Sequence, residues 1–414
     1  MGLEKITGRI AADLEGLKQF TATPGNGCTR LPFTKEARDA VNYLKDIMTE
    51  AGLEVWEDEV GNVFGILKGD EPDEPCVMMG SHYDSVKNGG DFDGIAGVVC
   101  AVEVARQLKE RGVTLKRSFV AAGFCDEEGL RFGTGYFGSG AMLGKRDVEY
   151  CKKFKDADGI SIYDAMVSYG LEPEKITDAK WPEGSIGSFL ELHIEQGPVL
   201  DAEHTELGLV NCIVGIQRYM VTVYGRADHA GTTPMDMRLD AAEAATKVIS
   251  RIPDWAREKG EGTVATTGFI RTTPGGMNIV AEKVEFTVDI RSTNNDYIND
   301  IATKIRVALE IETQKMGGSY EIENKLTITP VMLSEEMLKI MEADCLEKGF
   351  SCRYLPSGAG HDALEIGQVI PTVMLFVPSR EGRSHCPVEF TKYSDFTKAS
   401  VIMADLAQKL LEKE

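Results

Sequence analysis

The 414-residue sequence predicts an α/β protein, in which a mixed β-sheet flanked by helices is interrupted by a smaller inserted α+β domain. The first supporting observation is an alternation of helical repeats and short apolar runs near the start of the chain. The second is a change of this pattern near residue 212, and the third is its return near residue 330. We therefore expect one domain from residues 1–212 and 330–414, and an inserted domain at residues 213–329.

The N-terminal part predicts two amphipathic helices followed by strands. Apolar residues recur at helical spacing from Leu3 to Leu17 and from Ala37 to Met48. The segment "LEVWEDEVGNVFGIL" is typical of a β-hairpin. The strand "CVMMGSH", the helix "GIAGVVCAVEVARQLKERG" and the strand "SFVAAGFC" then form a βαβ unit. Such a unit indicates a parallel or mixed sheet covered by helices.

The middle of the chain follows a different order of elements. Beyond residue 212 the pattern reads strand, helix, two strands, helix and strand, which is the ferredoxin-like arrangement. From about residue 330, a helix, the strand "TVMLFV" and a last helix from Ser394 resemble the opening architecture again. The segments of the inserted domain are "YMVTVYG", "AAEAATKVISRI", strands near 263–270 and 283–291, "YINDIATKIRVALEIETQ" and "YEIENKLTI".

Composition excludes several classes of protein. The net charge is −21 and the basic residues are scattered, which opposes binding to nucleic acid or to an anionic membrane. The N-terminus lacks the apolar core of a signal peptide, and no apolar run has the roughly 18 residues of a membrane span. The nine cysteines are irregularly spaced without a CxxC pair, so we expect reduced thiols and no thiolate zinc site. A cytoplasmic protein is expected.

Candidate metal ligands follow the predicted parallel strands. The first buried strand ends in His82, and Asp84 can hold its imidazole through the other ring nitrogen. Asp93 stands at the start of the next helix after a glycine-rich loop, where a carboxylate can bridge two cations. The second strand ends in Glu127 and Glu128, which point different ways, so one can bind metal while the other faces a water.

Two further histidines extend this set. His193 ends an alternating strand, and His385 follows "TVMLFV". A single His-x-Asp pair is commonly a surface pair, and an acidic run is commonly a solvated loop. Their joint placement at strand ends, where open α/β sheets build their sites, favours a two-metal centre.

Separated blocks of the chain resemble one family. These blocks resemble N-carbamoyl-L-amino acid hydrolases and allantoate amidohydrolases, within the wider aminoacylase and carboxypeptidase family of two-metal hydrolases with a zinc-exopeptidase-like fold. The resemblance extends from Thr29 to Phe390. The blocks are "GSHYDSV" with "GGDFDG", "DEEGLRFG", "ELHIEQGPVL", "ADHAGTTPMDMRLDA", "PGGMNIV", "SGAGHDA" and "SHCPVEFT".

The resemblance implies a role for each candidate. By it, His82 and His193 complete one metal site, Glu128 and His385 complete the other, and Asp93 bridges the two ions. Glu127 is then the general base, which agrees with a carboxylate that takes a proton from water and returns it to a leaving nitrogen. Ligand type leaves zinc and manganese open.

The resemblance also assigns residues outside the metal centre. It implies that His229 stabilises the tetrahedral intermediate in the site of the other subunit, so the inserted domain is expected to serve as a lid and dimerisation domain of a homodimer. The implied substrate residues are Gln196, Asn278, Arg291 and Gly360. A guanidinium such as that of Arg291 suits a substrate carboxylate. His361 and Asp362 are candidates for a second orienting pair, and His204 is expected at the surface.

The expected function is hydrolysis of a ureido or N-carbamoyl group on a small carboxylate-bearing substrate. The choice between allantoate and an N-carbamoyl-L-amino acid stays open. One alternative is a dipeptidase or aminoacylase of the wider family, in which an acidic ligand commonly replaces His193. Another is a non-catalytic binding protein, which loss of a ligand or of the base would favour. All five ligands and Glu127 are present.

Overall fold

The computed structural model describes residues 2–412, which divide into two compact units. One unit comprises the chain up to Asn211 together with the chain from Met332 onward, and the other is Cys212–Val331.

The larger unit is built on a nine-stranded sheet with the order β1-β2-β4-β3-β5-β14-β6-β12, and β13 also pairs with β6. The four central strands β4, β3, β5 and β14 run parallel, whereas β1, β2 and β6 pair antiparallel with their neighbours. The strands are β1 (Glu54–Glu57), β2 (Val63–Leu67), β3 (Cys76–His82), β4 (Phe119–Phe124), β5 (Ile186–Ile194), β6 (Leu207–Ile213), β12 (Val331–Met332), β13 (Cys352–Ser357) and β14 (Thr372–Val377).

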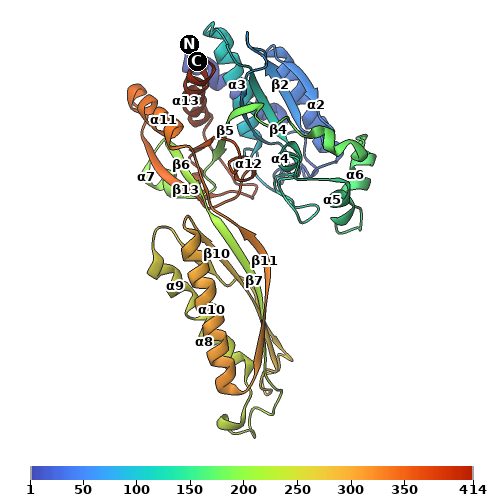
Figure 1. Ribbon diagram of the computed structural model, residues 1–414, viewed down its shortest axis with the longest axis vertical. Helices are drawn as coiled ribbons and strands as arrows, with labels where there is room; N and C mark the ends of the chain where they lie inside the picture. The colour runs from blue at the N-terminus through green and yellow to red at the C-terminus, as the bar shows by residue number, and fades with distance from the viewer. Residues whose placement is uncertain (1, 413–414) are drawn as a thin grey trace. The chain divides into compact units, whose positions relative to one another are not determined.

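Helices cover this sheet, as the sequence predicts. The helices α3 and α13 pack against each other (Figure 1), and both contact strands β3 and β5. Every residue of β3 and β4 is buried, which explains why these strands read as continuous apolar runs. The helices are α1 (Leu3–Leu17), α2 (Lys35–Glu50), α3 (Ile95–Glu110), α4 (Phe137–Met142), α5 (Val148–Lys153), α6 (Ile162–Tyr169), α7 (Val199–Glu203), α11 (Glu335–Lys348), α12 (Asp362–Ile366) and α13 (Tyr393–Glu412).

The smaller unit contains an antiparallel sheet with the order β11-β7-β10-β8, in which β9 also pairs with β10. Alternate residues of β10 are buried, and α8 and α10 pack on the sheet in Figure 1. The elements of this unit are β7 (Gly215–Tyr224), α8 (Ala241–Ile249), α9 (Ile252–Lys259), β8 (Val264–Thr266), β9 (Ile270–Thr273), β10 (Lys283–Ser292), α10 (Asn295–Met316) and β11 (Ser319–Ile328). A core of buried apolar side chains joins β7, α8, α9, β10 and α10.

Two elements of the smaller unit differ from the prediction. The helix predicted at residues 241–252 ends at Ile249, because Pro253 has no N–H to continue the ladder of α8, and a helix that was not predicted, α9, begins at Ile252. The strand predicted near residues 263–270 is two short strands, β8 and β9. Both pair with β10, so the strand–helix–strand–strand–helix–strand order is otherwise retained.

The cysteines and the helices bear on the expectations of reduced thiols and of no membrane span. All nine cysteines are free, and seven of them are buried. Within residues 2–412, no helix combines the length and the apolar character that crossing a membrane demands.

Candidate metal centre

The parallel strands bring the predicted ligands to one edge of the sheet. His82 is the last residue of β3 and pairs in register with Phe124, the last residue of β4. His193, near the end of β5, lies opposite Phe376 of β14. Because parallel strands end at the same edge, the segments that follow them converge there.

Asp93 reaches this edge from the loop before α3. Gly94, which precedes the helix, has a φ of 65°, and a Cβ at this position would lie 2.3 Å from the His82 ring. Only glycine combines this backbone conformation with so close an approach. The loop therefore passes directly over His82 and places the Asp93 carboxylate beside it.

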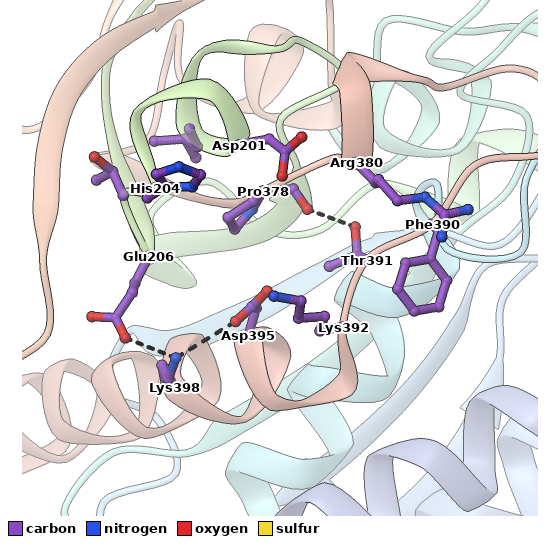
Figure 2. Close-up of a pocket in the computed structure, with 12 residues that line it drawn as sticks. Asp201, His204, Glu206, Pro378, Arg380, Phe390, Thr391, Lys392, Asp395 and Lys398 are labelled. Atoms are coloured by element: carbon purple, nitrogen blue, oxygen red, sulfur yellow. Dashed lines mark hydrogen bonds and ion pairs between the residues drawn. The ribbon is translucent and has the colours of Figure 1, made fainter.

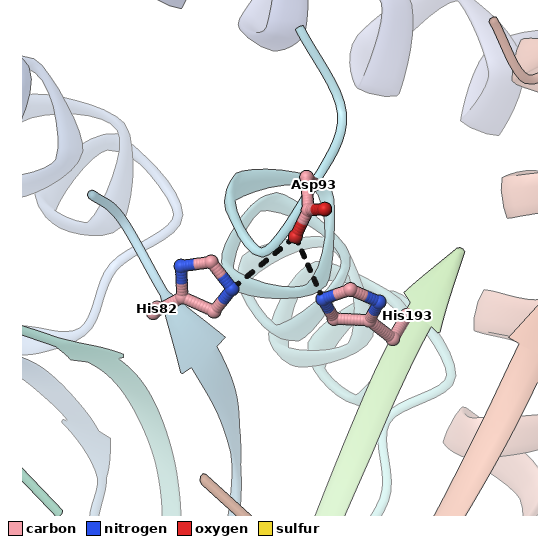
Figure 3. Close-up of side chains that lie close together, drawn as sticks. All are labelled: His82, Asp93 and His193. Carbon is pink, nitrogen blue, oxygen red and sulfur yellow. Dashed lines mark ion pairs between the residues drawn. The ribbon is translucent and has the colours of Figure 1, made fainter. Parts of the chain in front are cut away.

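The first group of ligands is His82, Asp93 and His193, which Figure 3 shows with both imidazoles directed at one carboxylate oxygen. Asp93 Oδ1 lies 3.4 Å from His82 Nε2 and 3.2 Å from His193 Nε2. The Nδ1 atoms lie 3.1 Å from the carbonyl of Asp84 and 2.9 Å from that of Ile194. Each Nδ1–H therefore donates to the main chain and leaves Nε2 with a lone pair that could bind a metal ion. In this structure His193 Nε2 accepts the main-chain N–H of Gly94 at 3.2 Å.

The second group is Asp93, Glu128 and His385. His385 Nε2 lies 3.2 Å from Asp93 Oδ2 and 3.3 Å from Glu128 Oε1. The two oxygens of Asp93 thus face different groups of ligands. Asp93 is buried, whereas the His385 side chain is 47% exposed and comes from a loop residue with a φ of 56°.

These residues fit a pair of divalent cations. Among the described residues, the buried atoms Asp93 Oδ1 and Glu128 Oε1 have no hydrogen-bond donor. A buried carboxylate oxygen without a donor is costly unless a cation satisfies it. Imidazole and carboxylate donors suit zinc, manganese and similar ions. The donor set does not distinguish among them.

The facing histidines dominate the electrostatics of Asp93. Burial by itself raises the pKa of Asp93, but His193, His385 and His82 outweigh it and hold this pKa well below its usual range. The nearby carboxylates of Asp93 and Glu128 in turn raise the pKa of His385 to about 10. The centre is therefore built around one ionised carboxylate.

The Asp84 carboxylate lies closer to the main chain of Glu127 and Glu128 than to the imidazole of His82. Its carbonyl, not its carboxylate, makes the 3.1 Å contact with His82 Nδ1, and the carboxylate is 3.5 Å away. The carboxylate instead accepts the main-chain N–H groups of Glu127 at 3.0 Å and Glu128 at 3.2 Å. Asp84 thus fixes the backbone from which Glu127 and Glu128 diverge.

Glu127 lies outside the two groups that contain Asp93, but it forms a third group with His82 and Glu128 whose atoms could hold an ion. Its Oε2 is 3.9 Å from His82 Nε2, and the residue is 7% exposed. Burial, together with the neighbouring Glu128, Asp362 and Asp84 carboxylates, raises the pKa of Glu127 well above its ordinary value, although His82 opposes this shift. Such a carboxylate holds a proton more readily than an exposed one, as a group that both takes up and returns a proton requires.

The other residues predicted in this unit lie close to the centre. Gln196 donates from Nε2 to Asp93 Oδ2 at 2.7 Å. Gly360 packs so closely on Tyr136 that a Cβ would overlap the Tyr136 hydroxyl. His361 Nε2 lies 2.9 Å from Ser357 Oγ, and the His361 ring lies 4.5 Å from the His193 ring between centroids.

Ser384 and Glu389 also contact this centre, although neither is predicted from the sequence. Ser384 Oγ lies 2.8 Å from both Asp93 Oδ2 and Glu389 Oε2, and Glu389 also accepts the main-chain N–H of Asp93. The signal that could have indicated them is their presence with His385 in the quoted block "SHCPVEFT".

Three predicted residues belong to the smaller unit. The exposed His229 pairs with Ile279 through an isolated bridge, so it lies near Asn278. Arg291 Nε lies 2.8 Å from Asp289 Oδ1, and Asp289 also binds Arg218. Within its own unit, the Arg291 guanidinium is thus held by a carboxylate.

His204 is exposed, at the edge of a separate pocket of about 340 Å³ (Figure 2). Lys398 in this pocket lies 2.8 Å from Glu206 and 3.6 Å from Asp395. Its lining contains acidic and basic groups in a mixture and none of the predicted metal ligands.

The fold and this centre define a member of a hydrolase family that uses a mixed α/β sheet. The chain belongs to peptidase family M20/M25/M40, whose family model matches residues 78–409. The family recognised from the sequence is thereby confirmed.

Similar proteins cover nearly the whole chain. An N-carbamoyl-L-amino-acid amidohydrolase of Paenarthrobacter aurescens is 38% identical, with 97% of each chain covered. An allantoate amidohydrolase of Bacillus subtilis (strain 168) is 37% identical, with 98% of each chain covered. A crystal structure of an amidase of the hydantoinase/carbamoylase family from Burkholderia multivorans has a TM-score of 0.88 and 30% identity, with 97% of each chain covered.

Proposed function

We propose that this protein is a metal-dependent amidohydrolase that cleaves the C–N bond of a ureido or N-carbamoyl group on a carboxylate-bearing substrate. The products are ammonia, carbon dioxide and an amine. Water adds to the ureido carbonyl, the terminal C–N bond breaks with release of ammonia, and the resulting carbamate loses carbon dioxide. One water molecule is consumed for each ureido group.

The observation that carries the proposal is the sharing of Asp93 between two groups of ligands. Its Oδ1 faces His82 and His193, and its Oδ2 faces His385, which also lies 3.3 Å from Glu128. We propose that the two groups hold two divalent ions, zinc or manganese. When bound, such ions polarise a carbonyl and lower the pKa of water.

Glu127 supplies the proton transfers in this proposal. It takes a proton from the attacking water and returns it to the leaving nitrogen. Its raised pKa, caused mainly by burial, suits both steps. Asp84 keeps Glu127 in place through the hydrogen bond from the Glu127 main-chain N–H.

Further features of the proposal rest on the family resemblance. We propose a homodimer of two domains per chain, in which His229 of the inserted lid serves the site of the other subunit. Asn278, Arg291, Gln196 and Gly360 bind the substrate. The free cysteines support a cytoplasmic location.

Hydrolysis assays test this function directly. The metal-loaded protein is incubated with allantoate and a panel of N-carbamoyl-L-amino acids, and the released ammonia is measured. N-acetyl amino acids and dipeptides serve as controls, because a peptidase or aminoacylase would cleave them. The relatives of 38% and 37% identity bear the two different substrate names, so the panel also decides between them. Cleavage of the controls alone would overturn the proposal.

A further inference from the structure

Glu389 is a buried carboxylate beside the metal centre. It follows His385 by four residues and is 6% exposed. It lies in none of the three groups whose atoms could hold an ion. Glu389 is therefore not a candidate metal ligand, although it lies next to Asp93.

The Glu389 carboxylate joins two loops. Its Oε1 accepts the main-chain N–H of Phe92 at 3.0 Å and that of Asp93 at 3.1 Å. Its Oε2 lies 2.8 Å from Ser384 Oγ, which lies 2.8 Å from Asp93 Oδ2. Glu389 thus contacts the backbone of Asp93 directly and the carboxylate of Asp93 through Ser384.

The surrounding chain is shaped to receive this carboxylate. A Cβ at Gly90 would lie 1.9 Å from Glu389 Oε1, so a larger residue there would displace the carboxylate. Phe92 packs on Phe390, next to Glu389, with ring centroids 6.0 Å apart, and on Phe396 with centroids 5.8 Å apart. The close approach and the aromatic contacts hold the two loops together.

This arrangement supports the two groups of ligands unequally. His82 and His193 project from buried strands, whereas His385 lies on a loop and is half exposed. Ser384, the neighbour of His385, contacts Asp93 Oδ2, which is the oxygen that faces His385. The hydrogen bonds of Glu389 therefore bear on the Asp93–Glu128–His385 group.

We propose that Glu389 is a positioning residue that acts through Ser384 and the Asp93 main chain to hold Asp93 Oδ2 and His385 in place for one of two metal ions. This inference rests on the proposed two-metal function. Groups that orient ligands in this way typically contribute about 10- to 100-fold to metal affinity. The Asp93–His82–His193 group keeps its strand-borne histidines without this contact.

Metal titration of the full-length protein tests the inference. Metal-free wild type and Glu389→Ala are titrated with Co²⁺, and binding is followed by visible absorption and calorimetry. Wild type is expected to bind two ions per chain. Glu389→Ala is expected to bind one ion as wild type does and the other about 10- to 100-fold more weakly. Ser384→Ala is expected to weaken the same step less, because the two main-chain hydrogen bonds remain.

Two controls separate positioning from general loss of structure. Glu389→Gln keeps an oxygen acceptor for the two N–H groups, and its NH₂ can donate to Ser384 Oγ while the Ser384 hydroxyl donates to Asp93 Oδ2, so it is expected to bind both ions nearly as wild type does. Asp58→Ala also removes a buried carboxylate that accepts two main-chain N–H groups, those of Val60 and Asn62. It is expected to lower thermal stability and leave both Co²⁺ steps unchanged.

The outcomes are distinct. Unchanged Co²⁺ binding in Glu389→Ala, or equal weakening of both steps, would overturn the inference while leaving two-metal binding intact. If Asp58→Ala also weakened both Co²⁺-binding steps, the effect of Glu389→Ala would be explained by a general loss of structure and not by positioning. Wild type that binds fewer than two ions would overturn the proposed two-metal function and this inference with it.

Discussion

Gly94 allows a sharp test of how the chain builds the metal centre. An alanine Cβ at this position would lie 2.3 Å from the His82 ring, a distance at which one of the two groups must move. Gly112, at the other end of α3, has a nearly equal φ of 67°, and a Cβ there would have no other atom within 4 Å. Both substitutions place a Cβ on a residue with a positive φ, but the ψ of −58° puts Gly94 outside the left-handed helical region, and only the Cβ of Gly94→Ala meets the His82 ring.

The magnitudes follow from this difference. A left-handed backbone costs a residue with a Cβ about 1–2 kcal/mol, so Gly112→Ala is expected to lose at most roughly this much stability. Gly94→Ala is expected to lose more, because the φ and ψ of Gly94 are those of a classic γ-turn, which is rare and strained. Only Gly94→Ala displaces a proposed ligand, and we expect its metal affinity to fall by at least about 100-fold, the upper range for changes that disturb ligand orientation. Thermal unfolding with and without added metal, and the metal content after dialysis, measure the two effects.

Two results would refute this reasoning. If both variants keep the metal affinity of wild type, the Gly94 backbone does not set the position of His82. If Gly112→Ala loses metal as Gly94→Ala does, backbone strain at the ends of α3, rather than the close approach, controls the centre.

Three further predictions concern catalysis and substrate. Glu127→Gln is expected to lower kcat by about 10²- to 10⁴-fold with nearly unchanged metal content, whereas Glu128→Gln is expected to lose metal; exchanged behaviours would reverse the two roles. Mixing inactive His229→Ala chains with inactive Glu127→Gln chains is expected to restore some ammonia release in heterodimers, and verified heterodimers without activity would place His229 outside the partner's site. Arg291→Lys is expected to lower kcat/KM by about 10- to 100-fold for a substrate with a carboxylate and much less for its neutral amide analogue, because the bidentate contact is lost. Equal losses for the two substrates would make the role of Arg291 structural.

The central strands could be predicted from the sequence because strands buried on both faces consist of continuous runs of apolar residues. Strands β3 and β4 are buried throughout, and their apolar runs end where His82 and the acidic residues after Phe124 begin. The parallel register then brings these ends together. This register explains why His82 and the acidic residues after β4 lie together, whereas Asp93 and His385 reach the same edge from loops.

Other features depend on contacts that local patterns do not contain. Glu389 and the main chain of Phe92 are separated by 297 positions in the sequence, so only the folded chain reveals their hydrogen bond. The sequence predicts that the Asp84 side chain holds the His82 imidazole. In the structure the Asp84 carbonyl contacts the imidazole, and the Asp84 carboxylate accepts the main-chain N–H of Glu127. The short strands β6 and β13 lie on one side of the parallel region and have no helical or βαβ pattern to mark them.

The most direct test of the central claim is ammonia release from ureido substrates as metal is returned to the metal-free protein. The measurement records the rate for allantoate and for N-carbamoyl-L-amino acids against equivalents of Zn²⁺ or Mn²⁺ per chain. We predict no activity without metal and a rise that ends at two equivalents with at least one of these substrates. Full activity in the metal-free protein, or no ureido hydrolysis with two ions bound, would contradict the proposed function.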